Sequence, residues 1–218
     1  MTVILLAPPG GGKGTQAKLL TKHYQMDHLS TGHMLRGALQ QGTPLGREAS
    51  KFVTAGLLVP DEIVIGIIKE RLLAAETKGV ILDGFPRTVA QAEALDHLLA
   101  DTQRSVDLVI NLEISPETSI QRLSGRRVCG QCGMEYHLLF YPPSVAGVCD
   151  QCGGGLVQRN DDVEEIIKNR WRVSEDERST LQDFYAKRGL LRKIDGDGTI
   201  DQVFHRVVEV LGRTTQYG

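Results

Sequence analysis

A glycine-rich stretch near the start of the sequence contains the residue types of a phosphate-binding loop. The run Ala7-Pro8-Pro9-Gly10-Gly11-Gly12-Lys13-Gly14-Thr15 follows the apolar residues 3–6 and precedes residues 16–20, whose apolar positions have helical spacing. This pattern predicts a strand, then a loop, then the start of a helix. In such a loop consecutive backbone N–H groups can surround phosphate oxygens, and Lys13 adds a full positive charge. The match to the general pattern G-x-x-x-x-G-K-[ST] is imperfect, because Ala7 replaces its first glycine and Gly14 replaces its hydroxyl residue. Taken alone, the stretch also fits an ordinary glycine-rich turn.

Asp83 is the second candidate for chemistry. It follows the apolar residues 80–82, which have the composition of a buried strand, and it precedes Gly84. In proteins with a phosphate-binding loop, a carboxylate at the end of such a strand commonly holds magnesium or the waters around it. The alternative is a turn residue, because Asp-Gly is a common turn pair.

Four cysteines form two closely spaced pairs, Cys129-x2-Cys132 and Cys149-x2-Cys152, with sixteen residues between the pairs. This spacing is typical of a structural zinc ribbon, with iron and a redox dithiol as the alternatives. A glycine follows the second cysteine of each pair and lets the backbone turn tightly towards the sulfurs. Four thiolates leave zinc no open position for a substrate, so the metal would stabilise the segment, with a free energy on the order of 10 kcal/mol.

Length and composition limit the remaining possibilities. The chain has 218 residues, which suits one α/β domain with an insertion, and 25 basic against 27 acidic side chains give a net charge of −2. Aromatic residues make up only 5%. This balance argues against a nucleic-acid or membrane surface, and the short apolar run at the start is unlike a signal peptide or a membrane span. We therefore expect a cytoplasmic protein whose cysteines stay reduced.

The pattern of apolar residues predicts strands that alternate with helices. Strand candidates lie at residues 3–6, 27–29, 80–82, 106–112 and 190–194. Helices are expected between them, including residues 34–39 with Ser30 or Thr31 as the cap, 44–55, 61–75, 89–99 and a helix from Pro116. Such alternation favours a parallel sheet with helices on both faces, with the ligand at the carboxyl ends of the strands.

A change in composition at residues 125–155, where glycine, proline and all four cysteines gather, indicates an inserted module. We divide the chain into a core P-loop domain (1–29, 60–124 and 163–218), a helical flap (30–59) and a lid (125–162).

Taken together, these motifs resemble those of adenylate kinases, in particular the long bacterial form with a zinc-bearing lid. The resemblance covers nearly the whole chain. Its main marks are Pro9-Gly10-x-Gly12-Lys13-Gly14-Thr15-Gln16, Ser30-Thr31-Gly32 with Met34-Leu35-Arg36, Asp83-Gly84-Phe85-Pro86-Arg87-Thr88 with Gln91, Gly125-Arg126-Arg127, Arg159 with Asp161-Asp162, and Arg170. Members of this family carry Gly-Lys-Gly-Thr in the loop, which accounts for Gly14.

The resemblance implies the α/β fold of a P-loop kinase, with a parallel five-stranded sheet, a helical AMP-binding flap and a small zinc-ribbon-like lid. It implies the reaction of magnesium-bound ATP with AMP to give two ADP, and nucleotides as the only partners of a monomer. The implied catalytic residues are Lys13, Asp83, Arg87, Arg126, Arg159 and Arg170. The implied ATP-binding residues are Gly10, Gly11, Gly12, Lys13, Gly14, Thr15, Arg122, Arg126, Glu135, Tyr136 and Gly198. The implied AMP-binding residues are Thr31, Arg36, Leu57, Leu58, Val59, Gly84, Phe85, Pro86, Arg87, Gln91, Arg159 and Arg170.

The physical demands of this reaction agree with the residue types. The phosphate of AMP is already an anionic nucleophile, so no general base is needed, and the protein must bring two polyanions into line and stabilise spread negative charge. Arginines and magnesium supply that stabilisation, and one well-placed arginine is worth roughly 10³ to 10⁵ in rate.

Two other functions remain open from the sequence. The chain can be a nucleoside monophosphate kinase of another base preference, although the long cysteine lid and Gln91 argue for AMP. It can also be a zinc protein that binds nucleotides without turnover, if Ala7 and His33 inactivate it. The retained Lys13 and Asp83 argue against that second alternative.

His33 stands where the family has an aspartate near the magnesium waters. An imidazole cannot supply the negative charge of the aspartate. Either magnesium affinity falls or His33 binds a softer metal or a phosphate instead, unless this position does not directly contact the magnesium waters. We expect activity to be retained.

The test is to exchange His33 for Asp and to measure the rate at increasing magnesium concentration. An unchanged curve shows that this position does not set magnesium affinity. A shift of the curve to lower magnesium concentration shows that it does.

Overall fold

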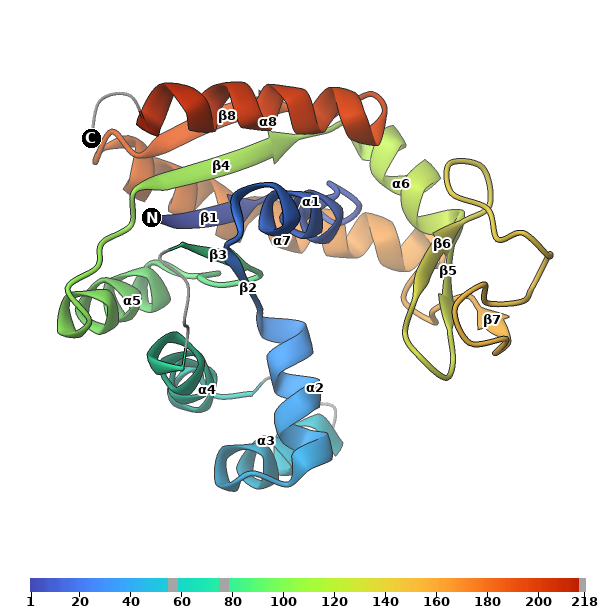
Figure 1. Cartoon of the computed structure of the whole chain (residues 1–218), viewed down its shortest axis with the longest axis horizontal. Coiled ribbons are helices and arrows are strands. Elements are labelled where there is room, and N and C mark those ends of the chain that lie inside the picture. The colour runs from blue at the N-terminus through green and yellow to red at the C-terminus, as the bar shows by residue number, and fades with distance from the viewer. Residues whose placement is uncertain (55–58, 75–78, 216–218) are drawn as a thin grey trace.

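The computed structural model describes residues 1–54, 59–74 and 79–215 and has an α/β architecture around one parallel sheet (Figure 1). The sheet has five strands in the order β2-β3-β1-β4-β8, and all of its neighbouring strands are parallel. Its strands are β1 (Thr2–Leu6), β2 (Asp27–Ser30), β3 (Val80–Asp83), β4 (Leu108–Glu113) and β8 (Leu191–Asp195). All five predicted strands are confirmed, with ends that differ by one or two residues.

The helices that the periodicity predicts are present, and a further helix, α8 (Ile200–Thr215), follows the last strand, where none was predicted. The others are α1 (Lys13–Tyr24), α2 (Thr31–Gln41), α3 (Pro44–Thr54), α4 (Asp61–Leu73), α5 (Val89–Asp101), α6 (Pro116–Ser124) and α7 (Glu164–Ala186). The predicted ends at residues 55 and 75 lie outside the described residues. Across the described part of the chain, no helix combines the length and apolar character needed to cross a membrane.

One expected helix cap is absent. Ser30 occupies the N-cap position of α2, but neither it nor Thr31 caps the helix with its side chain. The hydroxyl of Thr31 instead donates to the backbone oxygen of Asp83, at 3.2 Å. The helix start is thus tied to the end of β3, which is a tertiary contact that a capping rule does not consider.

Both faces of the sheet are buried. Along β1 the side chains alternate, so that Ile4 packs against the layer that contains α4, α5 and α7, while Val3 and Leu5 pack against α1 and α8. All three are at most 1% exposed. Each such side chain contributes about 1.5–3 kcal/mol of hydrophobic stabilisation, which makes the sheet a rigid support for the loops at its carboxyl edge.

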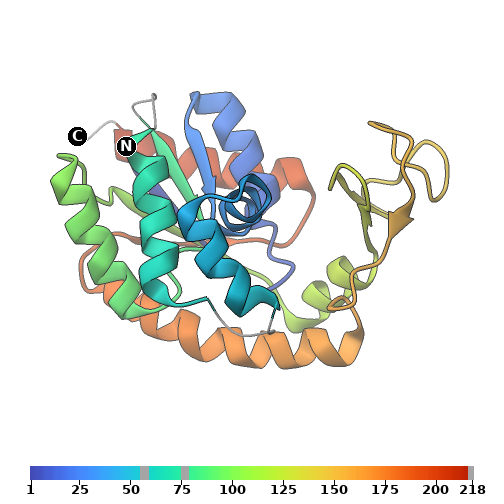
Figure 2. The same ribbon diagram turned by 90° about the horizontal axis from the view of Figure 1, so that it is seen from below.

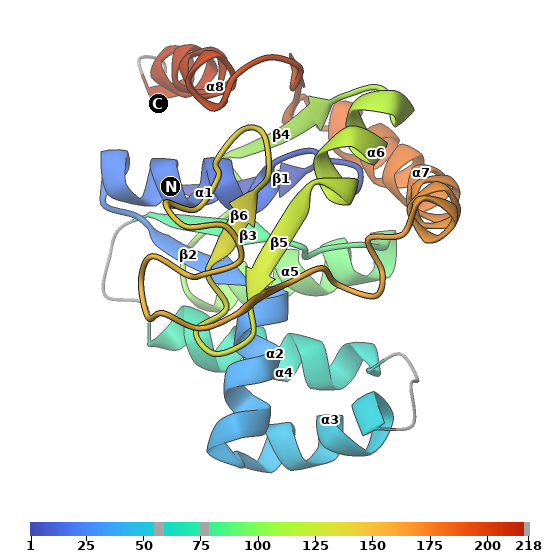
Figure 3. The ribbon, with the colours of Figure 1, turned by 90° about the vertical axis from the view of Figure 1, so that its right-hand side faces the viewer.

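A second, smaller sheet lies between α6 and α7, and residues 125–162, which contain it, are called the cysteine module below (Figures 1 and 2). Its three strands are β5 (Arg126–Cys129), β6 (Glu135–His137) and β7 (Leu156–Val157), which pair antiparallel in the order β6-β5-β7. Its small core contains Cys129, Tyr136 and Cys149. Seen from the side in Figure 3, the module lies in front of the sheet, while α2 and α3 extend from the sheet at the bottom of the view.

Candidate active site

The glycine-rich loop between β1 and α1 has the backbone that its sequence predicts. Gly10 and Gly12 have φ angles of 74° and 83°, in the left-handed region that favours glycine. A side chain on Gly10 would also lie 3.1 Å from the backbone oxygen of Ser119 in α6. The hydroxyl of Ser119 donates a hydrogen bond to the backbone oxygen of Pro9 at 2.7 Å, so α6 anchors the loop.

Ala7 fits in the loop without backbone strain, because its φ angle is not positive: in the described chain the non-glycine residues with positive φ are Gln25 and Gln103. A β-carbon on Gly11 would lie only 2.5 Å from that of Ala7. The glycine at position 11 therefore leaves the space that the alanine side chain fills.

Lys13 points back over the loop, and its Nζ donates to the oxygen of Ala7 at 2.7 Å. The pKa of Lys13 is lowered to about 8, mainly by burial, against the opposing effect of Asp83. The positive charges of three arginines contribute to this lowering: Arg87, Arg178 and Arg170. Positive charge from different parts of the fold therefore gathers around the lysine of the loop.

The carboxylate of Asp83 lies at the carboxyl end of β3, beside the first turn of α1. A β-carbon built on Gly14 would be 3.6 Å from Asp83 Oδ2. The same oxygen is 3.1 Å from Nε2 of His28, and the exposed fractions of the two side chains are only 13% and 16%. This arrangement fits the magnesium role predicted for Asp83, because an oriented carboxylate faces the place where phosphates would lie.

The sequence analysis did not identify His28 as a residue of the site, because it belongs to none of the recognised motifs. In the register of β2 and β3, His28 pairs with Ile81 and Ser30 with Asp83, so His28 and Asp83 lie on the same face. The contact between His28 and Asp83 follows only when the pairing of these two strands is known.

His33, by contrast, is exposed in the first turn of α2.

The loop after β3 carries residues predicted to bind AMP, and Gln91 holds it in place. Gln91 Oε1 accepts the backbone N–H of Arg87 at 2.8 Å, and its Nε2 donates to Asp61 at 2.6 Å. Arg87 also bonds to the oxygen of Gly84 through Nε, at 3.1 Å. The Phe85-Pro86 peptide bond of this loop is cis.

Other residues predicted for AMP are described only in part. Val59 is half-buried and packs against the core. Leu57, Leu58 and the side chain of Arg36 lie outside the described residues, so their predicted roles stay predictions.

Arg122 joins two segments predicted to bind ATP. Its Nη1 is 3.4 Å from the oxygen of Gly10, and its Nη2 donates to the oxygens of Gly196 at 2.9 Å and Gly198 at 3.3 Å. The glycine-rich loop and the loop after β8, which are almost 190 residues apart, are therefore neighbours in space. This contact supports the assignment of Gly198 to the ATP site.

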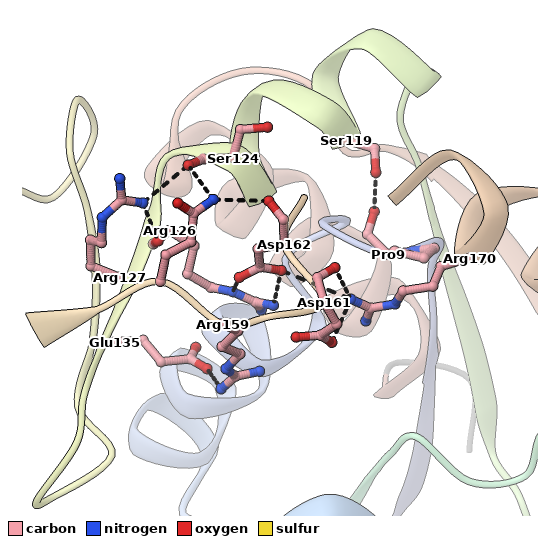
Figure 4. Close-up of polar contacts among 11 residues, drawn as sticks. Pro9, Ser119, Ser124, Arg126, Arg127, Glu135, Arg159, Asp161, Asp162 and Arg170 are labelled. Carbon is pink, nitrogen blue, oxygen red and sulfur yellow. Dashed lines mark hydrogen bonds and ion pairs between the residues drawn. The ribbon is translucent and has the colours of Figure 1, made fainter. Parts of the chain in front are cut away.

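Two predicted phosphate-binding arginines are paired with carboxylates where the cysteine module joins α7 (Figure 4). Arg126 makes two hydrogen bonds to the buried Asp162, at 2.8 and 2.7 Å. Arg170 bonds to the carboxylate of Asp161 at 2.7 Å and to its backbone oxygen at 3.1 Å. These pairs keep the two guanidinium groups in fixed positions near the join.

A third arginine pairs within the module, where Arg159 contacts Glu135 at 2.5 Å (Figure 4). Both side chains are substantially exposed, so this pair is readily exchanged for another partner. The neighbouring Tyr136 is different, because its ring is buried in the module core. Its hydroxyl accepts the N–H of Asp150 at 2.8 Å and lies 3.4 Å from Cys149 Sγ. The side chain of Tyr136 thus supports the cysteine cluster.

The four cysteines come together as their spacing predicts. Their sulfurs all lie within 4.8 Å of one another, with 3.4 Å between Cys129 and Cys152 and 3.5 Å between Cys132 and Cys149. A tetrahedral zinc site with Zn–S bonds of 2.3 Å needs sulfurs about 3.8 Å apart. The cluster can therefore bind zinc with little movement.

The backbone around the cysteines and the hydrogen bonds of Cys149 also suit a metal. The predicted turn glycines, Gly133 and Gly153, have φ angles of 73° and 72°. A hydrogen bond from the Tyr136 hydroxyl, supported by the N–H groups of Cys152 and Gln151, lowers the pKa of Cys149 to about 6. Hydrogen bonds of this kind stabilise thiolate, which is the form that binds metal.

His137 is another residue that the sequence interpretation set aside. Its Nδ1 accepts the N–H groups of Leu139 and Phe140, each at 3.1 Å, and its ring stacks on that of Phe140 with 4.4 Å between centroids. A β-carbon on Gly125 would lie 2.4 Å from His137 Nε2. Gly125 therefore allows the ring to pack closely over the start of the module.

Comparison with known proteins agrees with this geometry. The family model described as adenylate kinase matches residues 5–190. The chain belongs to the adenylate kinase family. The activity of that family, phosphoryl transfer between ATP and AMP, is accordingly the activity of this chain.

Similar curated relatives are also named adenylate kinase. The protein of Carboxydothermus hydrogenoformans is 51% identical over 212 residues, which cover 97% of this chain and 99% of the relative. Those of Geobacillus sp. (strain WCH70) and Methanothrix thermoacetophila are 49% and 48% identical over 213 and 214 residues, with 97% and 98% of this chain and 99% of each relative covered. The similarity to these adenylate kinases therefore includes the cysteine module as well as the core.

The position of Gln91 generates a prediction for this adenylate kinase family member. Changing Gln91 to Leu keeps the side-chain size but leaves the N–H of Arg87 without its acceptor, which should lower the free energy of unfolding by about 1–3 kcal/mol. The loosened loop should also raise KM for AMP more than KM for ATP. Urea unfolding and steady-state kinetics measure the two effects, with the exposed Gln41→Leu as the control. Equal changes in both KM values would contradict the selective effect on the Arg87 loop.

Proposed function

We propose that the chain transfers the γ-phosphoryl group of magnesium-bound ATP to AMP at the carboxyl edge of the sheet. The observation that carries this proposal is the convergence on Lys13 of charges from separate elements: Asp83 from β3, Arg87 from the loop after it and Arg170 from α7. Such a cluster suits two phosphate groups that must meet in line, because repulsion between polyanions is the main obstacle to their approach.

The donor side of the site is built on the glycine-rich loop. Its N–H groups and Lys13 would hold the ATP phosphates, and the loop around Gly198, tied to it by Arg122, would meet the adenine. Magnesium neutralises part of the phosphate charge when it is bound with ATP. Asp83 would hold it through its waters, and the hydrogen bond from His28 keeps that carboxylate oriented.

On the acceptor side, no proton has to be removed, since the phosphate of AMP attacks as an anion. Thr31, Arg36, residues 57–59, residues 84–87 and Gln91 would hold AMP, with Arg87 nearest to the transferred group. The role of Gln91 in this arrangement includes fixing the backbone of Arg87.

We infer that residues 125–162 act as a lid, residues 30–59 as an AMP-binding flap, and the remaining chain as the core. When the lid closes, Arg126, Arg159 and Arg170 would exchange their carboxylate partners for phosphate oxygens. This exchange makes the full arginine cluster available only with nucleotide present, and closure excludes the water that would otherwise hydrolyse ATP.

The direct test is ADP formation by the purified protein from ATP and magnesium, with AMP, GMP, CMP and UMP offered in turn. We expect turnover with AMP alone. Turnover with another monophosphate would keep the mechanism and change the specificity, whereas folded, zinc-containing protein without turnover on any acceptor would refute the proposal.

The lowered pKa of Lys13 predicts a proton uptake on binding. Phosphate charge beside Lys13 raises its pKa above about 8, so ATP binding at higher pH must bring a proton to the lysine. Affinity should be constant below pH 8 and then fall by up to about tenfold per pH unit, until the pKa of the bound state is reached.

Calorimetry at pH 9 in two buffers of different ionisation enthalpy measures this uptake. The exchange Lys13→Met should abolish it, while Lys18→Met, on an exposed position of the same helix, should leave it intact. Proton uptake that persists in Lys13→Met would assign it to another group.

We infer that zinc occupies the cysteine cluster, with one equivalent per chain. Exchanging Cys149 for Ser should release zinc and unfold the module, because the metal supplies on the order of 10 kcal/mol to so small a core. Elemental analysis and hydrogen exchange of residues 125–162 measure both effects. Val145→Ala, at an exposed position in the same module, is the control. A module that stays protected without bound metal would contradict a structural role for zinc.

A further inference from the structure

Arg178 lies on the face of α7 that packs inwards. Most of the less exposed residues of this helix recur every three or four positions, in a stripe made of Ile167, Arg170, Trp171, Ser174, Arg178, Leu181 and Tyr185, and Gln182 and Phe184 are the others. Ile167, Leu181 and Tyr185 are at most 2% exposed. The period of the helix therefore directs position 178 towards the interior, where a leucine would be the ordinary choice.

The guanidinium of Arg178 has few hydrogen-bond partners for a charged group that is largely buried. Its side chain is 11% exposed and pairs through Nη2 with Glu175, one turn earlier. Its centre lies 5.9 Å from the ring of Trp171. Within the described chain, Nε and Nη1 of Arg178 are buried without a hydrogen-bond partner. Since arginine is always charged, these two donors reduce stability as they stand.

The charge of Arg178 acts on the nucleotide site. It lowers the pKa of Lys13 together with Arg87 and Arg170, the two arginines already expected to bind phosphate. Of the charges that act on Lys13, only that of Asp83 is negative, while three guanidinium groups are positive. Arg170 and Arg178 are partly neutralised by their own partners, Asp161 and Glu175. An anion of high charge is the natural complement, and the reacting nucleotides bring such charge to this place.

Resting on the function proposed above, we propose that Arg178 is a further phosphate-binding residue, which donates hydrogen bonds from Nε and Nη1 to the phosphoryl group in transit. Negative charge spreads over the oxygens of that group during transfer, so the contact gains most in the transition state. Neither the loop motif nor the family resemblance assigns this role to position 178.

The test compares the whole protein with Arg178→Met, which keeps the stem of the side chain and removes the charge. We expect kcat to fall roughly 10- to 100-fold, the effect of losing hydrogen bonds to a charged group, while KM for ATP and AMP changes by less than about threefold. Arg178→Lys should lose less, because it keeps the charge without the guanidinium geometry. Arg172→Met is the matched control, since Arg172 is exposed on the same helix and bonds to Asn169.

Thermal stability separates phosphate binding from a structural role. Replacing the buried charge of Arg178 by methionine should leave Tm unchanged or raise it, because two donors of the guanidinium have no hydrogen-bond partner in the described chain. A fall in kcat with unchanged or higher Tm supports the proposal. A fall that accompanies a comparable loss of Tm in Arg178→Met and in Arg178→Gln would assign Arg178 to the structure instead.

Fluorescence gives an independent measurement, because Trp171 is the single tryptophan of the chain. ADP should draw the guanidinium away from the ring and change the emission in the unaltered protein and in Arg172→Met, but not in Arg178→Met. An unaltered protein that makes no ADP from ATP and AMP would refute the proposed function itself. An active protein whose kcat survives Arg178→Met would overturn only the role of Arg178.

Discussion

Crowding of positive charge around the glycine-rich loop is the constraint on which the rest of the structure depends. Lys13 lies where burial and neighbouring arginines oppose its charge, with Asp83 as the opposing carboxylate. Such an arrangement lowers stability on its own and becomes favourable when phosphate is present. The rigid, doubly covered sheet makes the arrangement possible, because hydrophobic burial of strands such as β1 offsets the electrostatic penalty at its edge.

The same constraint explains the carboxylates around the cysteine module. The arginines that we propose to bind phosphate would need partners at other times, and Asp161, Asp162 and Glu135 are in place to provide them. The three pairs differ in burial, from the buried Asp162 to the exposed Glu135. In a graded set of this kind the outermost pair, that of Arg159, is the easiest to exchange, and the buried pair of Arg126 is the hardest.

Local patterns predicted much of the molecule, because strands, helices and the cysteine cluster follow from residues close together in sequence. The apolar runs predicted all five parallel strands, and the two Cys-x2-Cys pairs predicted four sulfurs within reach of one metal. Where prediction failed locally, a distant contact had intervened: the hydroxyl of Thr31 bonds to Asp83 instead of capping α2.

The sequence by itself determined the chemistry that short motifs carry: a glycine-rich loop suited to phosphates, a carboxylate after a buried strand, a cluster of four cysteines suited to a metal, and a family of phosphoryl-transfer enzymes. Only the tertiary structure decided which side chains support that chemistry. The bond from His28 to Asp83 depends on the pairing of two strands, and Gln91 connects α4 to the loop of Arg87. Arg178 belongs to no motif in the sequence, and only the packing of α7 shows that its charge acts on Lys13. The physical reason is the same in each case, because burial and electrostatic environment come from residues distant in the chain, which no local pattern encodes.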